Sequence, residues 1–149
     1  MARVNTYLNF MGNAEEAFEF YRSVFGTEYV GEIMRIGDVP AGPGMPELTE
    51  VEKRLVMHMA LPILAGHVLE GTDMVASMGH EVRIGNNTTI ALQPDTREEA
   101  EALFAALSEG ATDVNPLTDM FWGDYWGTCL DRFGVRWMFD VPGGASSPD

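Results

Sequence analysis

The 149-residue chain has little cysteine and little positive charge. Its only cysteine is Cys129, which excludes an internal disulfide and any metal site built from several thiolates. Only 9 Lys and Arg stand against 23 Asp and Glu, and the resulting net charge of -14 would repel phosphate backbones and anionic lipid headgroups. We therefore expect no nucleic-acid partner and no membrane partner.

Long apolar runs and cofactor-binding glycine turns are also missing. No apolar run reaches membrane-spanning length, and residues 1–7 turn polar before the apolar core of a signal peptide could form. The segment Gly42-Pro43-Gly44 has no strand before it and no helix after it, so it does not resemble the turn with which methyltransferases hold their cofactor. We expect a soluble, cytoplasmic protein without a cofactor, and the sequence does not favour methyl transfer.

A strand followed by a capped helix is predicted near the start of the chain. Residues 4–10 mix β-branched and aromatic side chains, as is typical of a strand. Asn13 and Glu16 then have capping-box spacing, and Gly26 predicts the end of the helix. The apolar residues between them form one stripe at helical spacing: Ala14, Ala17, Phe18, Tyr21, Val24 and Phe25.

The same plan returns in the second half of the chain. A strand over residues 88–93 precedes Thr96 and Glu99, which have capping-box spacing, and Gly110 follows the helix. The helical stripe is Ala100, Leu103, Phe104 and Leu107. Placing Glu16-Ala17 over Glu99-Ala100 also superposes the two caps and stripes. This agreement favours an internal duplication over chance likeness.

Strand-like segments follow both helices, at 28–36, 54–61 and 67–70 and again at 113–117, 125–130 and 135–141. Each half is thus predicted to be β-α-β-β-β, within a single α+β domain. We expect the first repeat at 1–71, a connecting loop at 72–86, the second repeat at 87–142 and a frayed tail at 143–149. The loops at 38–52 and 72–86 are long enough to be functional lids or merely mobile.

Several motifs together resemble one known superfamily. They are the run from Tyr7 to Ala17, Phe20-Tyr21, Val24-Phe25-Gly26, Met57-His58, Gly71-Thr72-Asp73, Phe121-Trp122-Gly123 and the run from Asp131 to Trp137. They resemble the vicinal oxygen chelate superfamily of glyoxalases, bleomycin resistance proteins and extradiol dioxygenases, and its PhnB-like branch in particular. This resemblance implies tandem repeats that form a curled, half-barrel mixed sheet around a central cavity, and usually a homodimer.

The resemblance also implies where a metal would bind. Enzymes of this superfamily hold one divalent ion with a His or Gln on the first strand, a Glu on the fourth, a His on the fifth and a Glu on the eighth. These positions fall here on Thr6 (or Asn5), Glu70, Thr89 and Met138. Only Glu70 is a competent ligand, so we expect no metal in the usual place. The same resemblance makes Thr6, Thr89 and Met138 candidate ligand-binding residues.

Histidines near Glu70 are candidates for proton transfer. If the segments at 54–61 and 67–70 form a hairpin, a two-residue turn places His58 opposite Gly71, whereas a three-residue turn places it opposite Thr72 with Glu70 diagonal on the same face. Only the second arrangement makes a catalytic pair of Glu70 and His58. The alternative is a half-buried histidine with a structural hydrogen bond. His67 is a further candidate for proton transfer or metal binding.

Arg136 and Met138 share one face of the last predicted strand, opposite its apolar face. Next to a cavity, the Arg136 guanidinium could clamp a carboxylate or a phosphonate of a ligand. Pairing with a surface Asp or Glu is the alternative in so acidic a chain.

The aromatic cluster of Phe121, Trp122, Tyr125 and Trp126 is denser than a surface loop needs. Such rings suit a ligand pocket, a subunit interface or the core, and the sequence does not choose among the three. We count Trp122, Tyr125 and Trp126 as candidate ligand-binding residues. Cys129 is expected to be buried and unreactive.

These observations favour a homodimeric protein that binds a small organic molecule in a cavity between its repeats, without the metal usual for such proteins. A glyoxalase-like lyase or isomerase that uses Glu70 is the alternative enzyme hypothesis. A third hypothesis is a non-catalytic interaction protein in which the aromatic cluster is purely a dimer contact.

Overall fold

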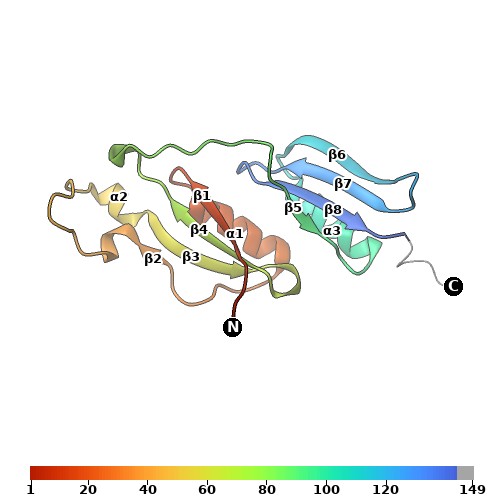
Figure 1. The fold of residues 1–149 in the computed structure, drawn as a ribbon, viewed down its shortest axis with the longest axis horizontal. Coiled ribbons are helices and arrows are strands. Elements are labelled where there is room, and N and C mark those ends of the chain that lie inside the picture. Colours follow the sequence, from red (N-terminus) through yellow and green to blue (C-terminus); the bar gives the residue numbers. More distant parts are fainter. Residues whose placement is uncertain (144–149) are drawn as a thin grey trace. The chain divides into compact units, whose positions relative to one another are not determined.

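The computed structural model describes residues 1–143, so the predicted tail lies outside the described residues except for Gly143. The chain divides into two compact units, one of residues 1–83 and one that begins at Ile84 (Figure 1). Each unit contains one four-stranded sheet and its own long helix.

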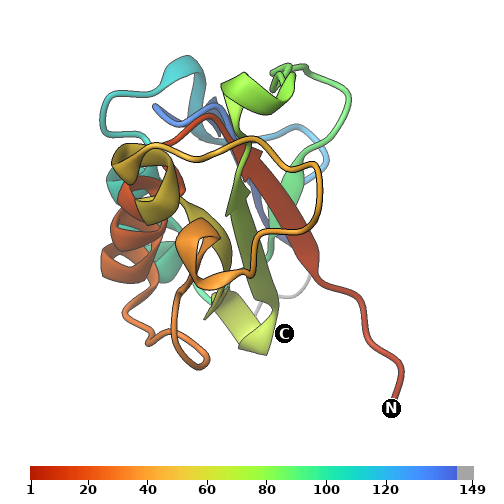
Figure 2. The ribbon, with the colours of Figure 1, turned by 90° about the vertical axis from the view of Figure 1, so that its left-hand side faces the viewer.

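The first unit runs β1 (Thr6–Phe10), α1 (Ala14–Phe25), β2 (Met34–Arg35), α2 (Glu50–Arg54), β3 (Val56–Pro62) and β4 (Val68–Asp73), with single 3-10 turns at Ile36–Asp38, Leu64–Gly66 and Ala76–Met78. Its strands lie in the order β1-β4-β3-β2. The β1–β4 pair is parallel and the other pairs are antiparallel. The helix α1 lies on one side of this sheet (Figure 2), and we call the opposite side the open face.

The second unit repeats this plan with β5 (Ile90–Leu92), α3 (Arg97–Leu107), β6 (Thr112–Asp119), β7 (Tyr125–Leu130) and β8 (Arg136–Val141). Its strand order, β5-β8-β7-β6, is that of the first unit, again with one parallel pair. The predicted α+β class with two β-α-β-β-β repeats is thereby confirmed. Neither described sheet closes into a barrel.

Both helix cores pack tightly against their sheets. In the first unit Phe18 and Tyr21 of α1 are fully buried, and Phe18 lies over Gly71 of β4. A Cβ atom at position 71 would stand 2.6 Å from the Phe18 ring, so glycine is required there. In the second unit the large buried rings are Trp137 and Phe139, both from β8.

The start of α1 is capped differently from the prediction. Helix α1 begins after Asn13, but the Asn13 side chain makes no capping hydrogen bond, so the predicted capping box with Glu16 is wrong. The buried carboxylate of Asp73 instead accepts hydrogen bonds from the backbone N–H of Gly12 at 3.1 Å, of Ala14 at 2.9 Å and of Val56 at 2.9 Å. A residue from β4 thus satisfies donors that the local sequence leaves free.

The cap of α3 is local, as predicted, although only half of the predicted box forms. The Thr96 hydroxyl accepts a hydrogen bond from the Glu99 N–H at 3.1 Å. The Glu99 carboxylate, however, accepts from the N–H of Asp95 and not from that of Thr96. One of the two expected reciprocal bonds is therefore replaced by a bond to the preceding residue.

Three predicted boundaries in the first unit change. The strand predicted at 28–36 is much shorter than expected, because only Met34–Arg35 form a strand paired with β3, and a 3-10 turn follows in which Asp38 accepts a hydrogen bond from the Arg35 N–H. The predicted loop at 38–52 contains the start of α2, which is capped by Thr49 and Glu52 in a complete capping box. The boundary predicted after residue 71 falls inside β4, which continues to Asp73.

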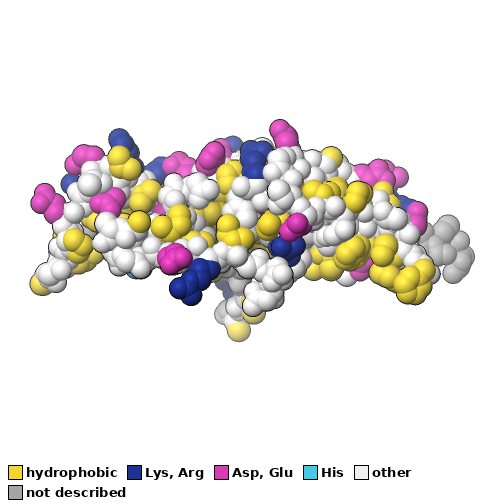
Figure 3. All heavy atoms as spheres, turned by 90° about the horizontal axis from the view of Figure 1, so that it is seen from above, with side chains coloured by type: hydrophobic (Ala, Val, Ile, Leu, Met, Phe, Trp, Pro, Cys, Tyr) yellow, Lys and Arg dark blue, Asp and Glu magenta, His cyan; other side chains and the backbone are white. Residues whose placement is uncertain are grey.

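The surface is acidic, and ion pairs engage several of its few basic side chains. Arg22, Arg35, Lys53, Arg97 and Arg136 each lie near a carboxylate. Figure 3 shows acidic groups spread over the visible face among apolar patches. Within residues 1–143, no helix has the length and apolar character to cross a membrane.

Candidate functional site

The open face of the first sheet gathers polar side chains from three strands. Tyr7 of β1 pairs with Glu70 of β4, and Asn9 pairs with Thr72. On β3, Met59 pairs with Gly71, so the preceding residue, His58, stands opposite Thr72. Because side chains alternate along a strand, these five residues share the face away from α1.

The strand pairing decides the geometry of His58 and Glu70. The β3–β4 turn is the three-residue turn Leu64–Gly66, closed by a hydrogen bond of 2.7 Å from the Ile63 N–H to the His67 carbonyl. Glu70 is therefore diagonal to His58, and their Oε1 and Nε2 atoms lie 2.9 Å apart. Of the two turn lengths that the sequence allows, the three-residue turn is present, and it brings His58 and Glu70 together as a pair.

Glu70 is held in its ionised form by its neighbours. The hydrogen bond from His58 is the main cause that lowers the pKa of this carboxyl, and burial opposes it. The Asn5 side-chain amide donates a further hydrogen bond to Oε2 at 3.3 Å, and the charge of Arg3 acts in the same direction. A carboxylate with these partners is an acceptor only.

The positions that would hold a metal do not fit one. The Thr6 hydroxyl is hydrogen-bonded to Nε2 of His67 at 2.8 Å, and Glu70 is occupied by His58 and Asn5. Among residues 1–143, no three or more His, Cys, Asp or Glu side chains converge as a set of metal ligands. Carboxylate and hydroxyl donors already paired with protein groups do not make a tight site for a first-row metal.

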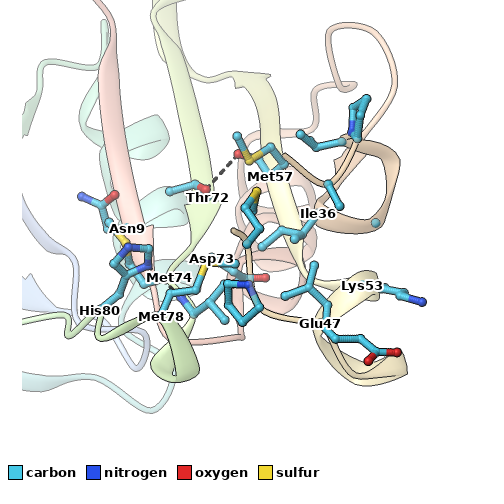
Figure 4. Close-up of a pocket in the computed structure, with 18 of the residues that line it drawn as sticks. Asn9, Ile36, Glu47, Lys53, Met57, Thr72, Asp73, Met74, Met78 and His80 are labelled. Carbon is cyan, nitrogen blue, oxygen red and sulfur yellow. Dashed lines mark hydrogen bonds between the residues drawn. The ribbon is translucent and has the colours of Figure 1, made fainter. Parts of the chain in front are cut away.

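A pocket of about 890 Å³ lies in the first unit beside these residues (Figure 4). Tyr7, Asn9 and Thr72 of the open face form part of its wall. Most of the rest comes from the segments 36–48 and 73–80, which contain most of the two predicted loops, and Lys53 and Met57 complete it. Four methionines line it: Met45, Met57, Met74 and Met78. The sequence does not predict this pocket.

Several polar groups of the pocket wall already have partners. The Thr72 hydroxyl donates to the Met57 carbonyl at 2.8 Å, as the dashed line in Figure 4 shows. The Nδ1 atom of His80 accepts from the Val75 N–H at 3.3 Å, and Asp73 accepts its three backbone donors. The wall that remains for a ligand is therefore mainly apolar.

The predicted site residues of the second unit do not all lie on one face. Arg136 and Met138 share the side of β8 opposite its buried residues, and Trp126 pairs with Asp140 on that same side. Arg136 lies 3.6 Å from Asp113, as the alternative reading expects. Tyr125 instead faces α3, where its hydroxyl donates to Glu101 at 3.0 Å.

The remaining predicted residues lie at the ends of strands. Thr89 is exposed immediately before β5. Trp122 lies in the β6–β7 turn next to Phe121, with their ring centroids 4.9 Å apart and with 51% and 97% of their surfaces exposed. These two rings therefore do not belong to the core. Cys129 is buried as expected, and burial raises the pKa of its thiol.

Comparison with known proteins agrees with this architecture. Residues 3–139 match the Glyoxalase/Bleomycin resistance protein/Dioxygenase superfamily. The chain belongs to this superfamily. Among solved structures, the chain is similar to PA1353 from Pseudomonas aeruginosa. The two are 31% identical, with a TM-score of 0.77 over 95% of this chain and 98% of that one.

The PhnB-like branch of the superfamily is represented among its structural relatives. The PhnB protein from Bacillus cereus is 25% identical, with a TM-score of 0.72 over 94% of this chain and 99% of that one. An uncharacterised protein of Mycobacterium tuberculosis, Rv0887c, is 29% identical over 136 residues, which cover 87% of this chain and 69% of the relative. The resemblance stated from the sequence is confirmed.

Proposed function

We propose that this chain binds a small, largely apolar molecule in the pocket of its first unit. The pocket carries the proposal, because a volume of about 890 Å³ lies within the range usual for ligand sites, about 300–1,000 Å³. Its wall combines apolar side chains with a few polar groups, as such sites typically do. Membership of the superfamily supports small-molecule binding but names no ligand.

The methionines of the wall favour a flat, unsaturated ligand. Thioethers are polarisable, make favourable contacts with aromatic rings and adapt to irregular shapes. The net charge of -14 makes the field around the pocket negative, which disfavours anionic ligands. A neutral aromatic or polycyclic molecule satisfies both conditions.

Two exposed methionines offer a matched test. Met57 lines the pocket and is 42% exposed, whereas Met11 is 44% exposed and does not line it. We expect Met57→Lys to weaken the binding of 2-methoxynaphthalene, measured by calorimetry, at least about tenfold, because a solvated ammonium would then occupy the apolar wall. Met11→Lys should leave the affinity unchanged. Equal effects of the two variants, or no binding to the unmodified protein, would refute the proposal.

Proton transfer is a second candidate function, favoured by the 2.9 Å contact of His58 with Glu70. A glyoxalase-like lyase or isomerase would use this pair on a substrate with neighbouring oxygens, with Glu70 as the base and His58 assisting. The test is turnover over a panel of α-oxo and dihydroxy compounds, which Glu70→Gln should abolish. Absence of turnover over the whole panel would exclude this candidate.

Self-association is also part of the proposal. The exposure of Phe121 and Trp122 supports a subunit contact, since aromatic rings are enriched at interfaces. Sedimentation should show a dimer that Phe121→Ser with Trp122→Ser dissociates; a stable folded monomer of the unmodified chain would contradict this. The predicted cavity between the repeats and the cytoplasmic location remain predictions.

A further inference from the structure

The hydrogen-bonding state of His58 follows from its partner. Nε2 of His58 lies 2.9 Å from Oε1 of Glu70, and the neighbours of Glu70 keep that carboxyl ionised. An ionised carboxylate offers no hydrogen, so the bond between them requires the hydrogen on Nε2 of the imidazole. In the neutral ring the lone pair is then on Nδ1.

The Nδ1 atom of His58 is available to a ligand. Glu70 is the only hydrogen-bond partner of the His58 side chain among residues 1–143, and 40% of that side chain is exposed. The ring also lies beside that of Tyr7, with their centroids 6.3 Å apart and a tilt of 39°. Two neighbours thus orient a ring whose acceptor atom has no protein partner.

His58 lies next to the pocket wall without forming part of it. It stands opposite Thr72 in the sheet, and its ring lies beside that of Tyr7; both of these residues line the pocket. A ligand that lies against Tyr7 and Thr72 is therefore next to the imidazole edge.

We infer that His58 selects ligands that carry a hydroxyl group, by accepting its hydrogen bond at Nδ1, and that Glu70 is the positioning residue that fixes the ring and its tautomer. This inference rests on the proposed pocket and adds a ligand class to it: a neutral, flat, mainly apolar molecule with a phenolic or enolic O–H. The arrangement requires no change of charge in the protein.

A pair of probes that differ only in the hydroxyl hydrogen tests the inference. 2-Naphthol donates a hydrogen bond, whereas 2-methoxynaphthalene has the same ring system and cannot. We expect calorimetry to give the naphthol an affinity about tenfold higher than that of the ether, as one net hydrogen bond predicts. His58→Phe should abolish this preference and keep the binding of the ether.

The role of Glu70 is tested by the same ratio of the 2-naphthol affinity to the 2-methoxynaphthalene affinity. Glu70→Gln offers Nε2 either an acceptor or a donor, so the tautomer is no longer fixed and the preference should fall between those of the unmodified protein and His58→Phe. Glu28→Gln is the matched control, because it removes an exposed carboxylate of the same unit that pairs with Arg22. That control should keep the full preference.

The outcomes separate this inference from the proposed pocket. If both probes bind equally well to the unmodified protein, or if His58→Phe keeps the preference, the inference is wrong while the pocket stands. If neither probe binds, the pocket proposal fails and the inference fails with it. Because the readout is a ratio within one protein, binding of the ether verifies that each variant is folded; His58→Leu replaces the Phe variant if it is not.

Discussion

The two units of this protein share one topology but fill their cores from opposite layers. In the first unit the fully buried rings, Phe18 and Tyr21, belong to the helix, and the strand supplies Gly71. In the second unit the strand supplies the fully buried ring of Phe139 at the corresponding position, since Gly71 and Phe139 each stand two residues before the end of their strand. A repeated fold therefore constrains the volume between helix and sheet, and not which layer provides it.

The buried carboxylate of each unit also stands at a different place relative to its strand. Each unit buries one aspartate that accepts hydrogen bonds from three N–H groups. Asp73 stands at the end of β4 and holds the start of α1, whereas Asp131 stands just before β8 and holds the N–H groups of Phe133 and Val135 and the indole of Trp137. The equivalent strands are thus anchored at opposite ends.

The outward sides of β4 and β8 also carry different charges. Glu70 precedes Gly71 on β4, whereas the uncharged Met138 precedes Phe139 at the same place on β8, and Arg136 stands two residues earlier. Glu70 is paired with His58, and Arg136 lies near Asp113. The polar pair beside a pocket is therefore a property of the first unit, and the predictions below test how far this asymmetry extends.

The largest expected effect on stability comes from the removal of one large buried ring from either core. Trp137→Ala and Phe18→Ala should each lower the free energy of unfolding by about 4 kcal/mol, because both rings are fully buried. Denaturant unfolding followed by far-ultraviolet circular dichroism measures both. A cost below about 1 kcal/mol for either variant would contradict the view that the two layers contribute equally.

Removal of the buried carboxylates should cost less. Asp73→Ala and Asp131→Ala each leave three N–H groups without their acceptor, and we expect a loss of about 2–3 kcal/mol for each. Only Asp73 lines the pocket, so only its replacement should also weaken the binding of 2-methoxynaphthalene, measured by calorimetry. Equal loss of binding in both variants would break the distinction between the units.

Replacement of the residues before the two long helices should have smaller effects on stability, and the two effects should differ. Thr96→Ala should destabilise the protein by about 1 kcal/mol, because its hydroxyl caps α3. Asn13→Ala should cost only a few tenths, about 0.3 kcal/mol, because its side chain makes no cap and Asp73 does. Thermal unfolding of the two variants side by side checks the difference. Similar costs would show that Asn13 caps α1 after all.

The smallest effect concerns Glu70 and pH. Its pKa is lowered from the ordinary value of 4.5, chiefly by the hydrogen bond from His58, so folding favours the ionised form. The resulting stabilisation is present above pH 4.5 and is lost as the pH falls through the lowered pKa. The stability difference between the unmodified protein and Glu70→Gln should therefore shrink below that pH in chemical denaturation. A difference that grows on acidification would have the wrong sign.

The sequence predicts the repeated elements well, because caps, glycine stops and apolar periodicity are local signals. All eight strands overlap predicted segments, and both long helices begin and end near their predicted residues. The strand predicted at 28–36 forms only at Met34–Arg35, because the backbone turns at Gly31, with a φ of 70°, before this pair and enters a 3-10 turn after it. The missed helix α2 did have a signal, the capping box of Thr49 and Glu52.

The candidate site is less accessible from the sequence. The pairing of His58 with Glu70 could be reduced to a choice between two turn lengths, since strand alternation fixes the rest. The pocket could not be foreseen, because its wall combines strand residues with two long loops whose paths depend on tertiary packing. The role of Asp73 was hidden for the same reason: its partners lie 17 to 61 residues away in the chain.

Asp73 has one more consequence, in the exchange of amide hydrogens with solvent. Its single carboxylate protects the N–H groups of Gly12, Ala14 and Val56, which belong to three separate segments. Displacing that side chain exposes all three donors in one event, so their exchange rates should respond together to temperature and denaturant. A ligand held against the pocket wall at Asp73 would slow the three rates in parallel, and this gives binding a signature in residues that do not themselves line the pocket.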